Sequence, residues 1–175
     1  MTMGRIVALL IIITSLLGGA VLYYLQVYAF YTLLPAQAVA DLRLTLADGT
    51  MVPVTASDFN GIDADSSPIR YRACFTPEGL PPVVELTPYP AANPLNAPMW
   101  FTCYSARDIG KALETGQARA VLGQKDVHFG IDRVIALMPD GRGYAWHQIN
   151  PCGAAVFDGN PAPEGCPPPP AATGN

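Results

Sequence analysis

The first forty residues constrain this chain more than any other feature, because no charged residue occurs from Ile6 to Ala40. The most apolar part runs from Ile6 to Leu25 and has no polar face that a soluble helix could expose. A helix of about 20 residues extends about 30 Å, which is the thickness of the hydrocarbon core of a bilayer. We therefore predict one transmembrane helix over residues 6–31, with the lipid bilayer as its first partner.

Tyrosines follow the apolar run, and we expect them at the membrane interface, where a ring can be half buried while its hydroxyl stays wet. They are Tyr23, Tyr24, Tyr28 and Tyr31. A cleaved signal peptide is the alternative, with Ala36-Gln37-Ala38 as the cleavage site. Signal peptides have apolar regions of about 7–15 residues, and this cleavage site lies far downstream. The pattern favours a retained signal-anchor.

Positive charge next to the short end sets the expected orientation. Arg5 and the amino terminus favour a cytoplasmic N-terminus at residues 1–5. Residues 32–40 then form a linker, residues 41–158 a domain outside the cytoplasm, and residues 159–175 a disordered Pro-rich tail.

Small residues lie side by side in the middle of the apolar run. Spacing of this kind lets a second helix approach closely. It predicts helix packing against a membrane-protein partner through Thr14, Ser15, Gly18 and Gly19. A high frequency of glycine in membrane helices is the simpler alternative.

The four cysteines form no CxxC pair of the kind used for zinc or redox chemistry. An even number outside the cytoplasm predicts two disulfide bonds, for which three pairings are possible, with free buried thiols as the alternative. We favour Cys152–Cys166, which closes a Pro- and Gly-rich loop, and Cys74–Cys103, which ties a strand to a proline-rich segment.

Apolar residues alternate with polar ones in several short segments, which is typical of half-buried strands. The fold class that they predict is α+β, an antiparallel sheet with one main packed helix. The helix starts at Ser105, which with Asp108 resembles a capping box, and stops at Gly116. The expected strands are 42–46, 52–55, 69–75, 83–86, 118–122, 131–138 and 144–149, with residues 57–68 as a loop.

Thr76–Pro98, here called the proline-rich excursion, contains seven prolines and is expected to lie on the surface. The excursion and the residues just after it contain aromatic side chains, for which there are two interpretations. They are predicted either to form a recognition surface or to pack the excursion onto the sheet. They are Tyr89, Trp100, Phe101 and Tyr104.

Charge and motifs argue against several function classes. Beyond Arg5 the chain carries nine basic and 14 acidic residues, so nucleic acid is not an expected partner. No phosphate-binding loop is present, so no nucleotide and no other cofactor is expected. No G-x-S-x-G motif occurs, which favours a protein that is not an enzyme.

The two histidines are the remaining candidates for chemistry. His128 and His147 would bind a metal only if the fold brought them together with Asp126 or Asp132. Residues 58–69 resemble a calcium loop but lack its Gly at position six and its Glu at position twelve.

Three stretches carry a resemblance: 3–10, 23–31 and 132–148, the last reading DRVIALMPDGRGYAWHQ. They resemble uncharacterised alphaproteobacterial membrane-anchored proteins. The resemblance implies a bacterial inner membrane, a periplasmic domain and a start at Met3, and it brings no activity or site residues.

The leading hypothesis is a non-enzymatic accessory or scaffold protein of the inner membrane. The second is a periplasmic binding or sensing module that uses the proline-rich excursion. The third is a metal-dependent or other enzyme centred on the two histidines.

Overall fold

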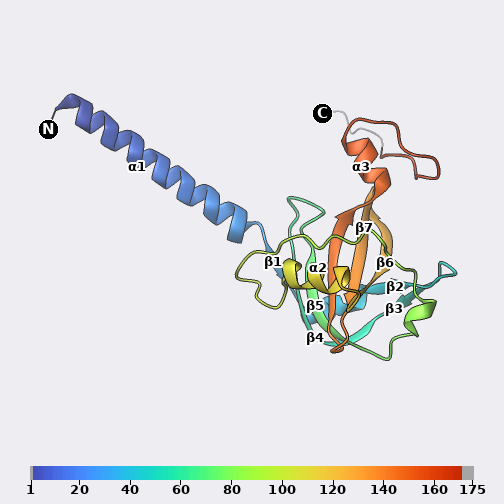
Figure 1. The fold of residues 1–175 in the computed structure, drawn as a ribbon. Coiled ribbons are helices and arrows are strands. Elements are labelled where there is room, and N and C mark those ends of the chain that lie inside the picture. The colour runs from blue at the N-terminus through green and yellow to red at the C-terminus, as the bar shows by residue number, and fades with distance from the viewer. Residues whose placement is uncertain (1, 171–175) are drawn as a thin grey trace.

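The computed structural model describes residues 2–170, which form a long N-terminal helix and a separate compact α+β domain (Figure 1). Helix α1, Met3–Tyr24, continues as one π-helical turn, Leu25–Ala29. This gives one apolar helix of 27 residues, long enough to cross a membrane. The helix ends at Ala29, so Tyr31 lies beyond it and not within a helix extending to residue 31.

The domain is built on a six-stranded antiparallel sheet in the order β1-β4-β5-β8-β7-β6. The predicted hairpin is confirmed, because Val134 pairs with Trp146 across β7 and β8. A second hairpin, β2–β3, turns at Asp48-Gly49, where Gly49 has φ +85°. The strands are β1 Thr32–Leu34, β2 Arg43–Thr45, β3 Met51–Pro53, β4 Thr55–Asp63, β5 Arg72–Glu78, β6 Arg119–His128, β7 Ile131–Leu137 and β8 Gly143–Ile149.

The sheet buries both faces, and different segments cover them. The β2–β3 hairpin covers what we call the closed face, where ten buried residues, Leu44 and Ile135 among them, form one core cluster. Helix α2 and the proline-rich excursion cover the other, which we call the open face, around Trp146 and Tyr144. Strand residues alternate between the two clusters, as period-two side-chain directions require.

Helix α2, Ala106–Glu114, is the predicted soluble helix. The Ser105 side chain accepts a hydrogen bond from the backbone N–H of Asp108 at 3.3 Å, which confirms its capping role. Its inward face buries Ile109 and Ala112 against the sheet, whereas Leu113 is only half buried.

Three segments expected to be irregular are ordered elements. Residues 57–68 were predicted as a loop, but β4 occupies Thr55–Asp63. A register shift at Ser57/Asn60, with Asp58 at φ +54°, interrupts the alternation that would have identified the strand. The expected linker 32–40 contains β1 and a 3-10 turn, Ala36–Asp41. Residues 151–157 form helix α3, Pro151–Phe157, capped by Asn150.

Other segments differ in type or extent. The expected strand 83–86 is a 3-10 turn, η3 Val83–Glu85, which follows two prolines; only Leu86 pairs, with Leu46. Strand β5 ends at Glu78 and not at residue 75, so the excursion leaves the sheet three residues later. Strand β6 runs to His128, beyond the expected end at residue 122. Residues 159–170 are irregular chain, and the rest of the predicted disordered tail, 171–175, lies outside the described residues.

Both disulfide bonds predicted by the sequence are confirmed. Cys74 of β5 is bonded to Cys103, and Cys152 of α3 is bonded to Cys166. The first therefore fastens the end of the excursion to the open face, and the second fastens the tail to α3.

Candidate functional site

A cleft of about 560 Å³ lies at the β6 edge of the open face, between the proline-rich excursion and helix α2 with the start of β6. Its walls are largely apolar, and Glu114 and Arg119 supply its charged groups. The other lining side chains include Val84, Leu86, Tyr89, Pro90, Pro94 and Leu113. An apolar cleft with a few polar groups is the usual form of a ligand site.

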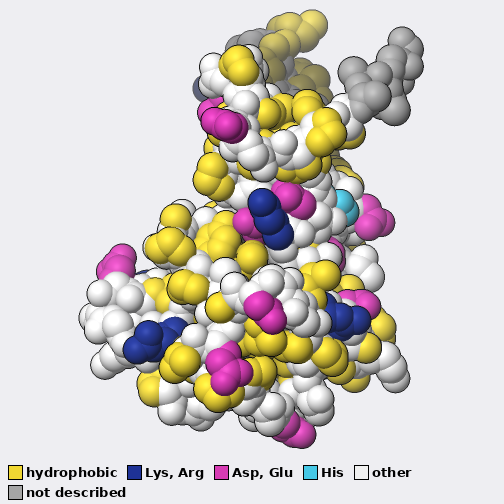
Figure 2. Space-filling model, turned by 90° about the vertical axis from the view of Figure 1, so that its right-hand side faces the viewer, with side chains coloured by type: hydrophobic (Ala, Val, Ile, Leu, Met, Phe, Trp, Pro, Cys, Tyr) yellow, Lys and Arg dark blue, Asp and Glu magenta, His cyan; other side chains and the backbone are white. Residues whose placement is uncertain are grey.

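Backbone pairing at the sheet edge positions one wall of this cleft. The Tyr89 N–H donates to the Ala120 oxygen at 3.0 Å, and the Leu122 N–H donates to the Thr87 oxygen at 2.8 Å. The excursion therefore covers the edge strand β6 for a few residues only, because its prolines lack N–H donors. Figure 2 looks at the side of the domain that carries β6, where hydrophobic side chains lie between separated charges of both signs.

The buried Arg72 ties the excursion to the sheet, a role that sequence reasoning missed. Its guanidinium donates to the Leu95 oxygen at 2.8 Å and the Asn96 oxygen at 3.2 Å, and lies 5.9 Å from the centre of the Tyr104 ring. Burial lowers the pKa of Arg72 from its ordinary value. In the alternating run from Ile69 to Phe75, Arg72 occupies a polar position, which by itself predicts exposure. The available signal was that it shares a strand face with Cys74, whose predicted bond to Cys103 brings the excursion over that face.

The aromatic residues around the excursion mainly pack it onto the sheet, which was the second of the two predicted roles. Phe101 and Tyr104 are buried in the open-face cluster, whereas Tyr89 and Trp100 are half buried. Tyr89 donates its hydroxyl to Asp132 at 3.1 Å, and burial followed by the charge of Asp132 raises the Tyr89 pKa.

Trp100 joins the domain to the helix. Its indole N–H donates to the Val27 oxygen at 2.7 Å, and its ring stacks on Tyr28 with centroids 6.4 Å apart. Tyr31 packs edge-on against the same indole. Arg70 donates to the Gln26 amide oxygen at 3.0 Å, so both side chains fix how the domain sits on the helix end.

The other predicted helix residues lie where the apolar helix is exposed. Space is open around Gly18 and Gly19, since a Cβ placed on either would meet nothing within 4 Å. The Thr14 hydroxyl donates to the Leu10 oxygen, and Ser15 is exposed on the same helix. Tyr23, Tyr24 and Tyr28 have roughly half of their surface exposed at the helix end nearest the domain.

The two histidines lie near one another, with ring centroids 6.3 Å apart. Both ring nitrogens of His147 have hydrogen-bond partners within the domain. Its Nδ1 lies 2.7 Å from the Pro68 oxygen, and its Nε2 accepts from Arg133 at 3.1 Å. Burial, followed by the charge of Arg133, lowers the His147 pKa to about 3. The neutral ring therefore has both nitrogens bonded, which leaves no lone pair for a metal ion.

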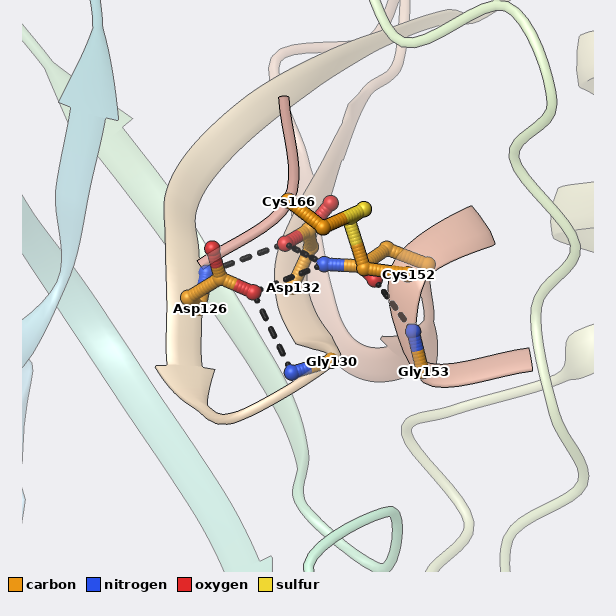
Figure 3. The surroundings of a disulfide bond; sticks show 7 residues. Asp126, Gly130, Asp132, Cys152, Gly153 and Cys166 are labelled. Atoms are coloured by element: carbon orange, nitrogen blue, oxygen red, sulfur yellow. Dashed lines mark hydrogen bonds between the residues drawn. A yellow bond between two sulfur atoms is a disulfide. The ribbon is translucent and has the colours of Figure 1, made fainter. Parts of the chain in front are cut away.

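The two aspartates considered with the histidines instead fix the base of α3 (Figure 3). The Asn150 amide donates to Asp126 at 2.9 Å and to Asp132 at 2.8 Å. Asn150 in turn accepts from the Gly153 N–H, which begins α3 beside the Cys152–Cys166 bond. Within residues 2–170, no three His, Cys, Asp or Glu side chains gather as metal ligands.

Comparison with known proteins assigns a family. Residues 42–167 match the model of the Family of unknown function (DUF6446). No curated protein and no solved structure matches the chain.

Proposed function

This chain belongs to the DUF6446 family of unknown function, and we propose that it is a non-enzymatic accessory or scaffold protein of a bacterial inner membrane. The observation that supports this proposal is the 27-residue apolar helix. None of its membrane-crossing part is buried against the domain. So much exposed apolar surface is stable only in lipid or against another apolar surface. The helix adds nothing to the core of the domain, so its role is attachment.

The two disulfide bonds support a periplasmic position for the domain, because such bonds persist in oxidising compartments. Arg5, before the apolar run, favours a cytoplasmic N-terminus. Both arguments give the same topology, although they rest on different parts of the chain.

The engagement of His147 and of the cysteines supports a role other than catalysis. Both nitrogens of His147 are bonded, and its one ring lone pair accepts from Arg133. All four cysteines are in disulfide bonds. A nucleophile or general base needs a free lone pair at the reacting atom.

The helix face with Gly18 and Gly19 is the proposed contact with a partner helix. Substituting both glycines with leucine should remove co-purification from mild detergent with any partner, because leucine side chains keep two helix backbones apart. Ala20→Leu is the matched control: it also enlarges a small residue, but 100° per residue places it on the other side of the helix. Mass spectrometry of the purified material measures the outcome. Equal recovery of partners with both variants would contradict the helix contact.

A periplasmic binding module is the second candidate, and the cleft on the open face favours it. Val84 on its wall is 87% exposed, so apolar surface is available there for a peptide or another apolar ligand. Leu113→Trp should fill the cleft and remove ligand binding, whereas Asp108→Trp on the exposed side of α2 should not.

The same purification separates the two candidates. Loss of partners with the glycine variant alone supports the scaffold function through the helix. Loss with Leu113→Trp alone supports the binding module. A secreted domain for that test should start at Thr32, because β1 pairs with β4 and a start at Asp41 would remove an edge strand.

A further inference from the structure

The segment Leu95–Trp100, here called the juxtamembrane loop, lies against the end of the apolar helix. A shallow cleft of about 270 Å³ separates them, lined by Tyr23 and Val27 on the helix side and by Pro98 and Met99 on the loop side. The loop thus runs beside helix residues that precede it by about seventy positions in sequence. Tertiary structure alone creates this neighbourhood.

The contact is fixed at both ends of the loop. Trp100 donates to the Val27 oxygen, one of the helix-end carbonyls that lack a partner within the helix. At the other end, the buried Arg72 guanidinium donates hydrogen bonds to the backbone oxygens of Leu95 and Asn96. The loop tip between these attachments therefore has a set height relative to the helix.

That height coincides with the expected membrane interface. If residues 6–25 fill the hydrocarbon core, a rise of 1.5 Å per residue places Val27 about 3 Å beyond its boundary. Tyr23, which lines the same shallow cleft, lies within the boundary turn. Loop atoms packed between these two residues are at the level of the lipid headgroups and upper acyl chains.

The chemistry of the loop suits that layer. Met99 is 85% exposed at the tip, next to Pro98. No charged residue occurs from Leu86 to Ala106, so inserting the tip desolvates no charge. An indole with its N–H satisfied is a common interfacial anchor.

We propose that the juxtamembrane loop is a second contact with the lipid surface, with Met99 inserted into the interface of the leaflet that faces the domain. The proposal rests on the proposed membrane anchor. Two attachments hold the domain in one orientation on the bilayer, whereas a single flexible tether would let it swing. The exposed Tyr23 of the helix end lines the same shallow cleft as Met99.

Fluorescence quenching in vesicles tests the proposal with the full-length chain. Met99→Trp places a reporter at the tip, and Val84→Trp is the matched control, since Val84 is an equally exposed residue of the excursion. Val84 belongs to η3, the green turn on the far side of the domain from α1 (Figure 1). The vesicles contain phosphatidylcholine brominated near the top of its acyl chains, and unbrominated lipid gives the reference emission.

Met99→Trp should lose at least about half of the emission that it adds to the wild-type spectrum, with a shift to shorter wavelength, as expected for an interfacial indole. Val84→Trp should keep its added emission. Equal quenching in the two variants while both chains stay with the vesicles through an alkaline carbonate wash would overturn the lipid contact. It would show that Met99 lies no closer to lipid than Val84 does. Release of the wild-type chain by that wash would instead overturn the proposed anchor.

Discussion

The two faces of the central sheet are covered in different ways. A hairpin joined by one tight turn covers the closed face, where Leu44 of β2 and Leu42 just before it are 1% and 0% exposed. The 27 residues that connect β5 to α2 cover the open face, where they leave a cleft of about 560 Å³. Six of these residues are prolines, and a seventh proline, Pro77, lies just before them. A hairpin satisfies its backbone internally and can pack closely, whereas a proline-rich segment cannot form a continuous ladder. Close packing therefore serves stability on one face, and looser packing leaves room for a ligand on the other.

The largest expected effect compares one leucine from each face. Leu44→Ala should lower the free energy of unfolding by about 4 kcal/mol, because it leaves a closed cavity in a packed cluster. Leu113→Ala should cost less than about 1 kcal/mol, because the half-buried side chain borders the open cleft and water can fill the space. Guanidinium unfolding of the Trp100→Phe chain in detergent micelles, followed by the emission of the remaining buried Trp146, measures both when each substitution is made in that background. Equal losses would mean that the two faces are equally packed.

Removing the disulfide bonds one at a time tests what holds the open face together. Replacing Cys74 and Cys103 with serine should lower the free energy of unfolding by about 3–4 kcal/mol, since that bond closes a loop of about 30 residues between two packed segments. The same change at Cys152 and Cys166 should cost less than about 1 kcal/mol. Residues 161–165 are exposed, so without the bond the tail detaches while the sheet keeps its packing. The same unfolding measurement applies, and a larger loss for the second pair would show that the tail belongs to the cooperative core.

Acid should weaken the closed face gradually through His147, so the loss within any one pH unit is smaller than the largest losses above. Its folded pKa is about 3 against 6.5 for the unfolded chain, so the unfolded state binds more protons between these values. Stability from this group is therefore complete above about pH 6.5 and declines as the pH falls toward about 3, by at most about 1.4 kcal/mol per pH unit. Burial and the charge of Arg133 hold the ring in the neutral form, against the opposite effect of the hydrogen bond to the Pro68 oxygen. His147→Gln should flatten the slope of the free energy of unfolding against pH, and an unchanged slope would place the acid sensitivity elsewhere.

Local pattern predicted the elements that are regular along the chain. The β7–β8 hairpin follows from two short apolar segments on either side of a Pro-Asp-Gly turn, and α2 follows from Ser105 as its cap. Strand β4 was missed because the bulge at Asp58 shifts its alternation by one residue. Helix α3 was missed because seven residues with Pro at the start and glycine inside give a weak helical signal, even though Asn150 before Pro151 is a good capping sequence.

The candidate site depends on contacts between distant residues, which local pattern does not encode. The cleft exists because Thr87 and Tyr89 pair with β6 more than thirty residues away. The shallow cleft at the helix end exists because Trp100 reaches Val27. The histidine hypothesis shows the same limit: sequence could name His147, but only its neighbours Arg133 and Pro68 reveal that both nitrogens are bonded.

The sequence by itself determined a single apolar helix, an antiparallel α+β domain and the pairing favoured for four cysteines, because hydrophobic period, length and loop spacing are properties of the chain alone. Tertiary structure decided which face of the sheet stays open, where the juxtamembrane loop lies and what the buried polar groups contact. These features depend on which distant segments can satisfy one another's backbone and side-chain hydrogen bonds once the apolar surfaces are buried.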